Sequence, residues 1–154
     1  MQKIIIADTS CLIVLDKVGY LDLLNKVFGE VVITQQVFEE FGKSAPPWIL
    51  IEKTKNPNPN QKILEATLDK GEASSISLAM DYDDSLLIID ESKGRKIAKS
   101  LGLKITGTLG ILVIAKSNNL IGEVKPIIDK IKSTNFRISP QLEQLVLIKC
   151  EEKI

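Results

Sequence analysis

Short apolar runs rich in β-branched residues alternate with helix-like segments along most of the chain. Because strands separated by helices pair in parallel, with helices packed on both faces of the sheet, this order predicts an α/β protein. We expect a three-layer α/β/α fold around a central, mostly parallel sheet of about five strands. The strand-like runs are Lys3–Ala7, Val31–Ile33, Trp48–Ile51, Leu86–Ile89 and Leu103–Thr106.

Capping residues and apolar periodicity mark the helices between these runs. Thr34 is expected to cap a helix that ends at Gly42, and Ser139 with Pro140 to begin the last helix. The Pro- and Asn-rich stretch 56–60 predicts a surface loop. The helical segments expected are Cys11–Leu15, Leu21–Phe28, Gln35–Phe41, Lys62–Leu68, Gly71–Met80, Ser92–Leu101, Thr108–Lys116, Gly122–Ile131 and Ser139–Cys150.

Length and composition predict one globular domain over residues 1–154, because 44% of the residues are hydrophobic, 26% are charged and no repeat interrupts them. The two cysteines, Cys11 and Cys150, lie at opposite ends and suit a reduced, cytoplasmic protein. The first apolar segment ends at Asp8, which is too early for a signal peptide. No apolar run approaches the ~18 residues of a membrane span, so no membrane contact is expected.

The chain contains no histidine. This excludes Ser-His-Asp triads, histidine-ligated zinc and any histidine general base. Any catalysis must therefore use carboxylates, lysine, hydroxyls, thiols or a metal ion held by oxygen ligands. Twenty basic residues balance twenty acidic ones, which excludes nucleic-acid binding by bulk positive charge but leaves room for a local patch.

Acidic residues follow two of the predicted strands. In an open α/β sheet, ligands bind at the carboxyl ends of the strands. The first strand ends in Asp8, and Leu86–Ile89 ends in Asp90 with Glu91 beside it. If these strands are neighbours, their carboxylates face each other across one crevice.

Two predicted helices add a glutamate each. On Gln35–Phe41 the helical period places Glu40 beside the apolar face and Glu39 further out. On Gly71–Met80 it places Glu72 on the buried stripe, where an unpaired charge is costly. Four carboxylates repel one another strongly, by about 4 kcal/mol for a pair ~4 Å apart at an effective dielectric of 20. Mg²⁺ or Mn²⁺, which prefer oxygen ligands, would neutralise them.

Each of these acids also has a purely structural interpretation. Asp8 can cap the helix that follows it, and Asp90 can begin a turn. The run Asp69–Glu72 fits a capping box, in which Glu72 reaches back to a free N–H. Glu40 alone is most often a solvated charge on a helix. The functional hypothesis depends on all four residues meeting at one edge of the sheet.

Four passages together resemble the PIN domain, the fold of VapC-type toxin ribonucleases, and in particular a prokaryotic branch of PIN-like proteins of poorly defined activity. The resemblance extends from Lys3 to about Ile121. The passages are Ile4–Ser10, Val32–Phe41, Leu68–Ala73 with Leu78 and Ala79, and Leu87–Glu91 followed by Gly94, Arg95, Ala98 and Gly102–Thr108.

The resemblance implies roles for particular residues. Asp8, Glu40, Glu72 and Asp90 match the catalytic acidic positions that bind Mg²⁺ or Mn²⁺ in such enzymes. Ser10 matches a supporting hydroxyl near that site. Glu91 is a further supporting residue, although this branch often has a second aspartate there.

The clearest basic run follows Asp90 directly and contains Arg95 and Lys96. It would contact an RNA backbone beside the metal ions, while a solvated helix face is the commoner origin of such a run. No G-x-x-x-x-G-K-[ST] or strand-linked G-x-G-x-x-G motif is present, which disfavours a nucleotide-binding loop.

The sequence therefore predicts a Mg²⁺- or Mn²⁺-dependent endoribonuclease. The resemblance to VapC proteins adds an expected role as a toxin, with a separate antitoxin as partner, and an expected homodimer. Leu142, Leu145 and Val146 form a stripe that either completes the core or forms the dimer face. The alternative function is a non-catalytic PIN-like module that binds RNA or a protein partner, which a site weakened at Glu91 and Lys93 would favour. A small-molecule α/β enzyme without a metal is a third possibility.

Overall fold

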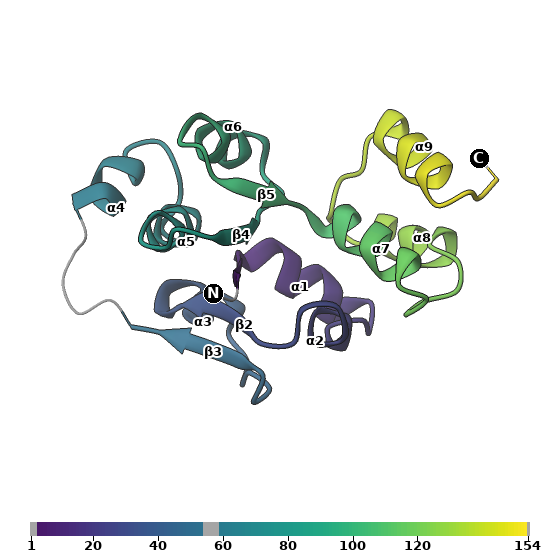
Figure 1. The fold of residues 1–154 in the computed structure, drawn as a ribbon, viewed down its shortest axis with the longest axis horizontal. Helices are drawn as coiled ribbons and strands as arrows, with labels where there is room; N and C mark the ends of the chain where they lie inside the picture. Colours follow the sequence, from purple (N-terminus) through teal and green to yellow (C-terminus); the bar gives the residue numbers. More distant parts are fainter. Residues whose placement is uncertain (1–2, 54–58, 154) are drawn as a thin grey trace.

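The computed structural model describes residues 3–53 and 59–153. Five parallel strands form a sheet in this part of the chain, with the order β3-β2-β1-β4-β5. The strands are β1 (Ile4–Ala7), β2 (Val31–Thr34), β3 (Ile49–Glu52), β4 (Ser85–Ile88) and β5 (Lys104–Thr106). Each overlaps a predicted strand, so the expected α/β fold with a five-stranded parallel sheet is confirmed (Figure 1).

Helices connect successive strands and extend the chain beyond β5. Those described are α1 (Thr9–Lys17), α2 (Asp22–Phe28), α3 (Gln35–Phe41), α4 (Pro59–Leu64), α5 (Lys70–Met80), α6 (Ser92–Ser100), α7 (Thr108–Ser117), α8 (Lys125–Lys132) and α9 (Pro140–Lys149). Across the described residues, no helix is both long and apolar enough to cross a membrane.

The boundaries of α4 differ from the prediction of a loop over residues 56–60 and a helix over Lys62–Leu68. Residues 56–58 lie outside the described part of the chain, whereas Pro59 and Asn60 form the start of α4. A proline suits the first turn of a helix, because its fixed φ is helical and its missing N–H would have had no helical partner there. Residues 65–67 are a turn instead of a helix.

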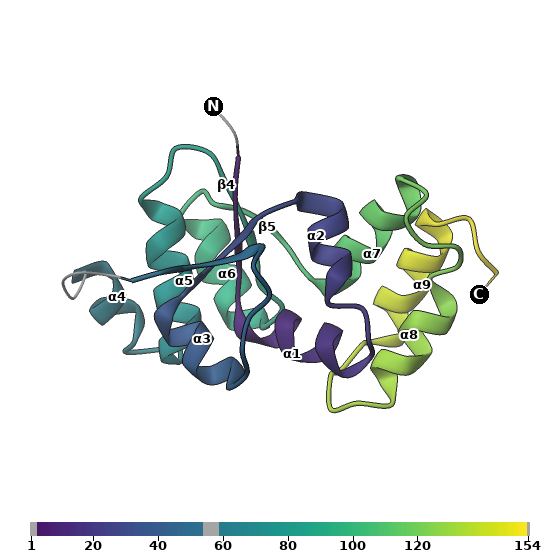
Figure 2. The same ribbon diagram turned by 90° about the horizontal axis from the view of Figure 1, so that it is seen from below.

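Alternate residues of the central strand β1 enter two different cores. Ile5 and Ala7 pack on the side of α1, α2, α7, α8 and α9, whereas Ile6 packs on the side of α5 and α6. This is the period of two expected for a strand that is buried on both faces. Figures 1 and 2 show the sheet between these two groups of helices.

Predicted caps are present at both ends of α3 and at the start of α9. The Thr34 hydroxyl accepts a hydrogen bond from the Val37 N–H (3.1 Å), and Gly42 ends α3 with a left-handed φ of 71°. Ser139 accepts from the Leu142 N–H (3.1 Å) at the start of α9. These caps satisfy N–H groups that otherwise have no partner within a helix.

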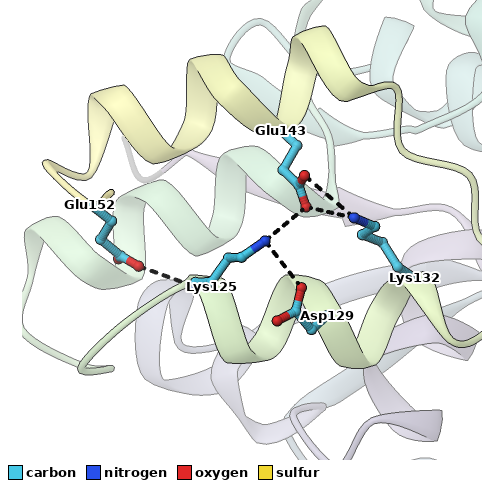
Figure 3. Close-up of polar contacts among 5 residues, drawn as sticks. All are labelled: Lys125, Asp129, Lys132, Glu143 and Glu152. Carbon is cyan, nitrogen blue, oxygen red and sulfur yellow. Dashed lines mark hydrogen bonds and ion pairs between the residues drawn. The ribbon is translucent and has the colours of Figure 1, made fainter. Parts of the chain in front are cut away.

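The last two helices, α8 and α9, are joined by ion pairs (Figure 3). Glu143 of α9 lies 3.0 Å from Lys132 and 3.6 Å from Lys125, which are the last and first residues of α8. Of the predicted stripe on α9, Val146 is buried, whereas Leu142 and Leu145 are 45% and 64% exposed. The homodimer stays a prediction, for which these two leucines offer exposed apolar surface.

Candidate functional site

The register of the two central strands brings Asp8 and Asp90 to the same edge of the sheet. Ala7 at the end of β1 is paired with Ile88 at the end of β4. Asp8 follows Ala7 directly, and its N–H donates to the Ile88 carbonyl (3.0 Å). Asp90 lies two residues beyond Ile88. The two aspartates expected to share one edge therefore follow neighbouring strands, at the edge where parallel α/β sheets bind ligands.

Asp8 is a buried carboxylate without a complete set of partners. It occupies the N-cap position of α1, yet its side chain makes no capping hydrogen bond. The residue is only 3% exposed, and its Oδ1 atom has no hydrogen-bond partner among the described residues. Burial, together with the negative charges of Asp69 and Glu40, raises the pKa of Asp8 to about 7. Capping therefore does not account for this residue.

Glu72 has the same unusual environment on α5. It is 8% exposed, and its Oε2 atom is buried without a hydrogen-bond partner in the described part of the chain. Burial, followed by Asp69 and then the charge of Asp8, raises the pKa of Glu72 to about 8. The cap of α5 is Asp69, whose Oδ1 accepts from the Glu72 N–H (2.8 Å). One half of the predicted capping box is present, and it leaves the Glu72 carboxylate free for another role.

Two glycines make room for the glutamates. A Cβ atom at Gly71 would overlap the Glu40 carboxylate, and one at Gly94 would lie 2.7 Å from Glu72 Oε2. Both approaches are closer than a real carbon and oxygen atom tolerate. Glu40 of α3 therefore lies against the backbone of α5, as its place beside the apolar face predicted, and Glu72 lies against α6.

Helix α3 is held against α5 by a buried hydrogen bond between the hydroxyls of Thr34 and Ser74 (2.7 Å). The same Thr34 hydroxyl caps α3, so one side chain fixes both the start of the helix that carries Glu40 and its distance from α5. Glu40 itself is largely exposed. Partial burial and the charge of Asp69 raise the pKa of Glu40.

Asp90 differs from Asp8 and Glu72 because both of its oxygens are engaged. Oδ1 accepts from the Thr108 N–H (2.8 Å), and Oδ2 accepts from the Thr108 hydroxyl (2.7 Å). Burial raises the pKa of Asp90, while the bonds from Thr108 and the nearby Arg95 charge oppose that rise. A carboxylate has about four lone-pair positions, so two hydrogen bonds leave acceptor capacity for a cation.

The remaining predicted residues surround this cluster. Ser10 is exposed in the first turn of α1, and Glu91 is exposed at the start of α6, where its charge reaches Glu72. The Arg95 guanidinium turns inward and donates to the Ile89 carbonyl (2.7 Å), whereas Lys96 is exposed on α6. The sequence hypothesis omitted Asp69 from the site. Its position three residues before Glu72 could have indicated that Asp69 lies near the site, but a role as the cap of α5 explained that spacing fully.

The donor set suits a hard divalent cation. Buried carboxylate oxygens without partners, at Asp8 and Glu72, are the ligands that Mg²⁺ and Mn²⁺ prefer. In the described part of the chain, no group of three or more Asp, Glu or Cys side chains is arranged so that it could hold a metal ion. A cation held by these carboxylates would therefore have few protein ligands and several water ligands, as is usual for Mg²⁺.

A family model for the PIN domain matches residues 4–152, which is nearly the whole chain. The chain belongs to the PIN domain family. No curated protein and no solved structure matches it. The family resemblance found in the sequence is thereby confirmed, and the match extends beyond Ile121 to include α8 and α9.

PIN domains are generally nucleases, that is, hydrolases of nucleic-acid phosphodiesters, and they typically use divalent metal ions. Membership in the PIN family therefore indicates nuclease activity in general. The carboxylates at the carboxyl edge of the sheet are the part of this PIN domain with the matching chemistry, because metal ions bound by oxygen activate water and stabilise charge on phosphoryl groups.

The close approach at Gly71 gives a test of Glu40. In Gly71→Ala the new methyl group must displace the Glu40 carboxylate, while alanine improves helix propensity by up to about 1 kcal/mol. We expect the metal-free variant to unfold at the wild-type temperature or slightly above it, with a smaller gain on adding Mn²⁺. Thermal unfolding with EDTA and with Mn²⁺ measures both. Gly122→Ala is the matched control, because nothing lies within 4 Å of its Cβ position. If Gly71→Ala kept the full Mn²⁺-dependent shift in unfolding temperature, Glu40 would not be one of the metal ligands.

Proposed function

We propose that this PIN domain is a Mg²⁺- or Mn²⁺-dependent endoribonuclease. The observation that supports this most strongly is the pair of buried, unpartnered oxygens on Asp8 and Glu72 at the carboxyl edge of the sheet. Burying ionised carboxylates without a partner is costly, so a chain that keeps two of them together gains from a bound cation. This stabilisation by a cation would occur at the carboxyl edge of the sheet, where a PIN-domain nuclease would need its metal ion.

Each of the four predicted acids would contribute oxygen ligands to the bound cations. Asp8 and Glu72 supply the buried oxygens, Glu40 closes the site from α3, and Asp90 contributes the lone pairs that Thr108 does not use. A divalent cation bound there would activate a water molecule and stabilise the charge of an in-line phosphodiester displacement. The exposed Ser10 hydroxyl would orient that water or a phosphate oxygen. Lys96 is exposed on α6, from which it can approach the RNA backbone.

RNA cleavage by the purified protein tests the proposal. With Mn²⁺ we expect a labelled single-stranded RNA to be cut, and EDTA to stop the reaction. Asp8→Asn keeps the shape of the side chain but removes its charge, so we expect cleavage to fall by a factor of at least about 100, as in losses of other electrostatic groups in active sites. Asp83→Asn, an exposed acid on the turn before β4, is the matched control and should cleave like wild type. Metal-dependent cleavage that survives Asp8→Asn would refute this mechanism.

A non-catalytic PIN-like module is the second candidate, and the state of Asp90 favours it. Both Asp90 oxygens are bound by Thr108, and Arg95 lies close by, which are the contacts of a structural carboxylate. On this hypothesis the domain binds RNA or a protein partner without cutting RNA. The toxin role and its antitoxin partner also stay predictions. The cleavage assay separates the two functions, because only the nuclease gives Asp8-dependent product.

A further inference from the structure

A groove lies between α1 and the loop that joins α8 to α9. Two hollows form it, and both are lined by residues 134–136 of the loop between α8 and α9. The smaller, of about 170 Å³, lies between this loop and the α1 residues from Ser10 to Lys17. The larger, of about 800 Å³, continues along the loop through residues 137–139. Because they share three residues, we treat them as one feature, the α1–loop groove.

One end of the α1–loop groove is lined by a residue that follows Asp8 closely in the chain. Ser10 lines the smaller hollow and is only two residues from Asp8, in the first turn of the helix that follows β1. Figure 2 shows the loop between α8 and α9 at the same edge of the molecule as the junction of β1 and α1. The groove therefore begins at the residue that we expect to orient the water or a phosphate oxygen at the proposed cleavage site, and a strand that continues past Ser10 would enter it.

The smaller hollow suits one planar ring. Ile13, Val14 and the Phe136 ring supply an apolar lining. An apolar hollow of roughly 150 Å³ accepts a benzene-sized ring, so 170 Å³ is sufficient for one small nucleobase. Asn135 is exposed on the same hollow, and its amide carries both donors and acceptors, as the edge of a base does.

Positive charges without acidic partners flank this hollow. Lys17 lies at the end of α1, and Arg137 lies on the loop; both are exposed. No ion pair among the described residues includes either of them. Lys132 also lines the larger hollow, but Glu143 holds it at 3.0 Å (Figure 3). Among the described residues that line the groove, Lys17 and Arg137 are therefore the two cations available to phosphates.

We propose that the α1–loop groove binds the single-stranded RNA substrate next to the cleavage site, with one base in the smaller hollow against Phe136 and the neighbouring phosphates on Lys17 and Arg137. A slot for one ring between two cations matches the alternation of base and phosphate in a strand. Double-stranded RNA keeps its bases stacked and paired, which favours single strands as the substrate class. This inference rests on the proposed ribonuclease function.

Binding measured by fluorescence anisotropy tests the groove without cleavage. The probe is a short fluorescein-labelled single-stranded RNA of mixed sequence, in EDTA so that it stays intact. We expect Lys17→Ala/Arg137→Ala to bind it about tenfold more weakly, with the slope of log K against log salt reduced by about 0.7 for each phosphate that the variant no longer neutralises. Lys26→Ala/Lys149→Ala removes the same charge from positions on α2 and at the end of α9, outside the groove, and should bind like wild type.

Two further probes test the occupant of the small hollow. The wild-type protein should bind the RNA about tenfold more tightly than a sugar–phosphate strand of equal length without bases, because such a strand cannot stack on an aromatic ring. It should also prefer the single strand to the same RNA in a duplex. Equal affinity for the strand without bases, or for the duplex, would overturn the proposal.

The cleavage assay keeps this proposal distinct from the nuclease function. If Asp8-dependent cleavage occurs but the groove variant binds RNA no more weakly than its control, the groove proposal is overturned and the nuclease stands. If the groove variant loses RNA binding while wild type never cleaves RNA, the groove is supported and the nuclease is overturned. If wild type neither binds nor cleaves RNA, both are overturned.

Discussion

Without metal at a pH of about 8, Asp8→Asn is expected to unfold at a higher temperature than wild type. Asp8 is 3% exposed, and its pKa is raised to about 7, so at this pH the wild-type protein holds a buried charge beside other carboxylates. Asparagine has nearly the same shape and no charge, and its amide can donate to those carboxylates. The free energy of unfolding should rise by an amount on the order of a few kcal/mol, because each unit of difference between the folded and the ordinary pKa corresponds to about 1.4 kcal/mol.

The same variant should lose the response to metal. With the proposed cation site, wild type should gain about 2.7 kcal/mol when Mn²⁺ is present at 100 times its dissociation constant. The asparagine of the variant offers one neutral oxygen in place of a carboxylate, so the Mn²⁺-dependent shift should nearly vanish. Calorimetry or circular dichroism in EDTA and in Mn²⁺ measures both effects, with Asp83→Asn as the control. An Asp8→Asn protein that is less stable in EDTA, or that keeps the full Mn²⁺ shift, contradicts the cation site.

The metal-free wild-type protein should become less stable as the pH rises from about 5 to about 8. In the folded state the pKa values of Asp8 and Glu72 are about 7 and about 8, above their ordinary values of 3.8 and 4.5. Between these values the folded protein binds more protons than the unfolded chain. The stability that these two groups contribute is therefore complete below the unfolded pKa values and is lost as the pH rises through the folded ones.

No histidine titrates in this pH window, because the chain contains none. Urea unfolding at several pH values in EDTA measures the slope. Mn²⁺ competes with protons for the same oxygens, so the stabilisation by Mn²⁺ should be larger at the alkaline end. Asp8→Asn should flatten part of the metal-free slope, while Asp83→Asn should leave it unchanged. A stability that is flat or rising across this range would mean that the buried acids do not carry raised pKa values.

Most of the fold could be predicted because its signals are local. The strands are short, mostly apolar runs that turn residues and helices separate, and Thr34, Gly42 and Ser139 carry their own capping chemistry. The exception is α4, where the same Pro and Asn residues that usually indicate a loop instead begin a helix at Pro59. Local composition alone does not separate these two uses of proline.

The site could be predicted only in outline. The ends of β1 and β4 locate Asp8 and Asp90, but the hydrogen bonds of Asp90 to Thr108 join residues 18 positions apart. The inward turn of Arg95 likewise depends on the Ile89 carbonyl at the end of β4. The α1–loop groove joins Ser10 to Phe136, which no local pattern relates. Contacts of this kind follow from packing, which the periodicity of apolar residues does not specify.

The two glycines against the glutamates have a consequence for comparing this chain with other PIN domains. A side chain at position 71 or 94 would overlap the carboxylate of Glu40 or Glu72 where it now lies, so that acid would have to move. A related sequence can therefore retain every carboxylate and still have an obstructed centre, if a side chain has appeared at either position. In such a comparison the residues at positions 71 and 94 therefore indicate whether the glutamates can keep the places that they have in this chain, which the presence of the acids alone does not indicate.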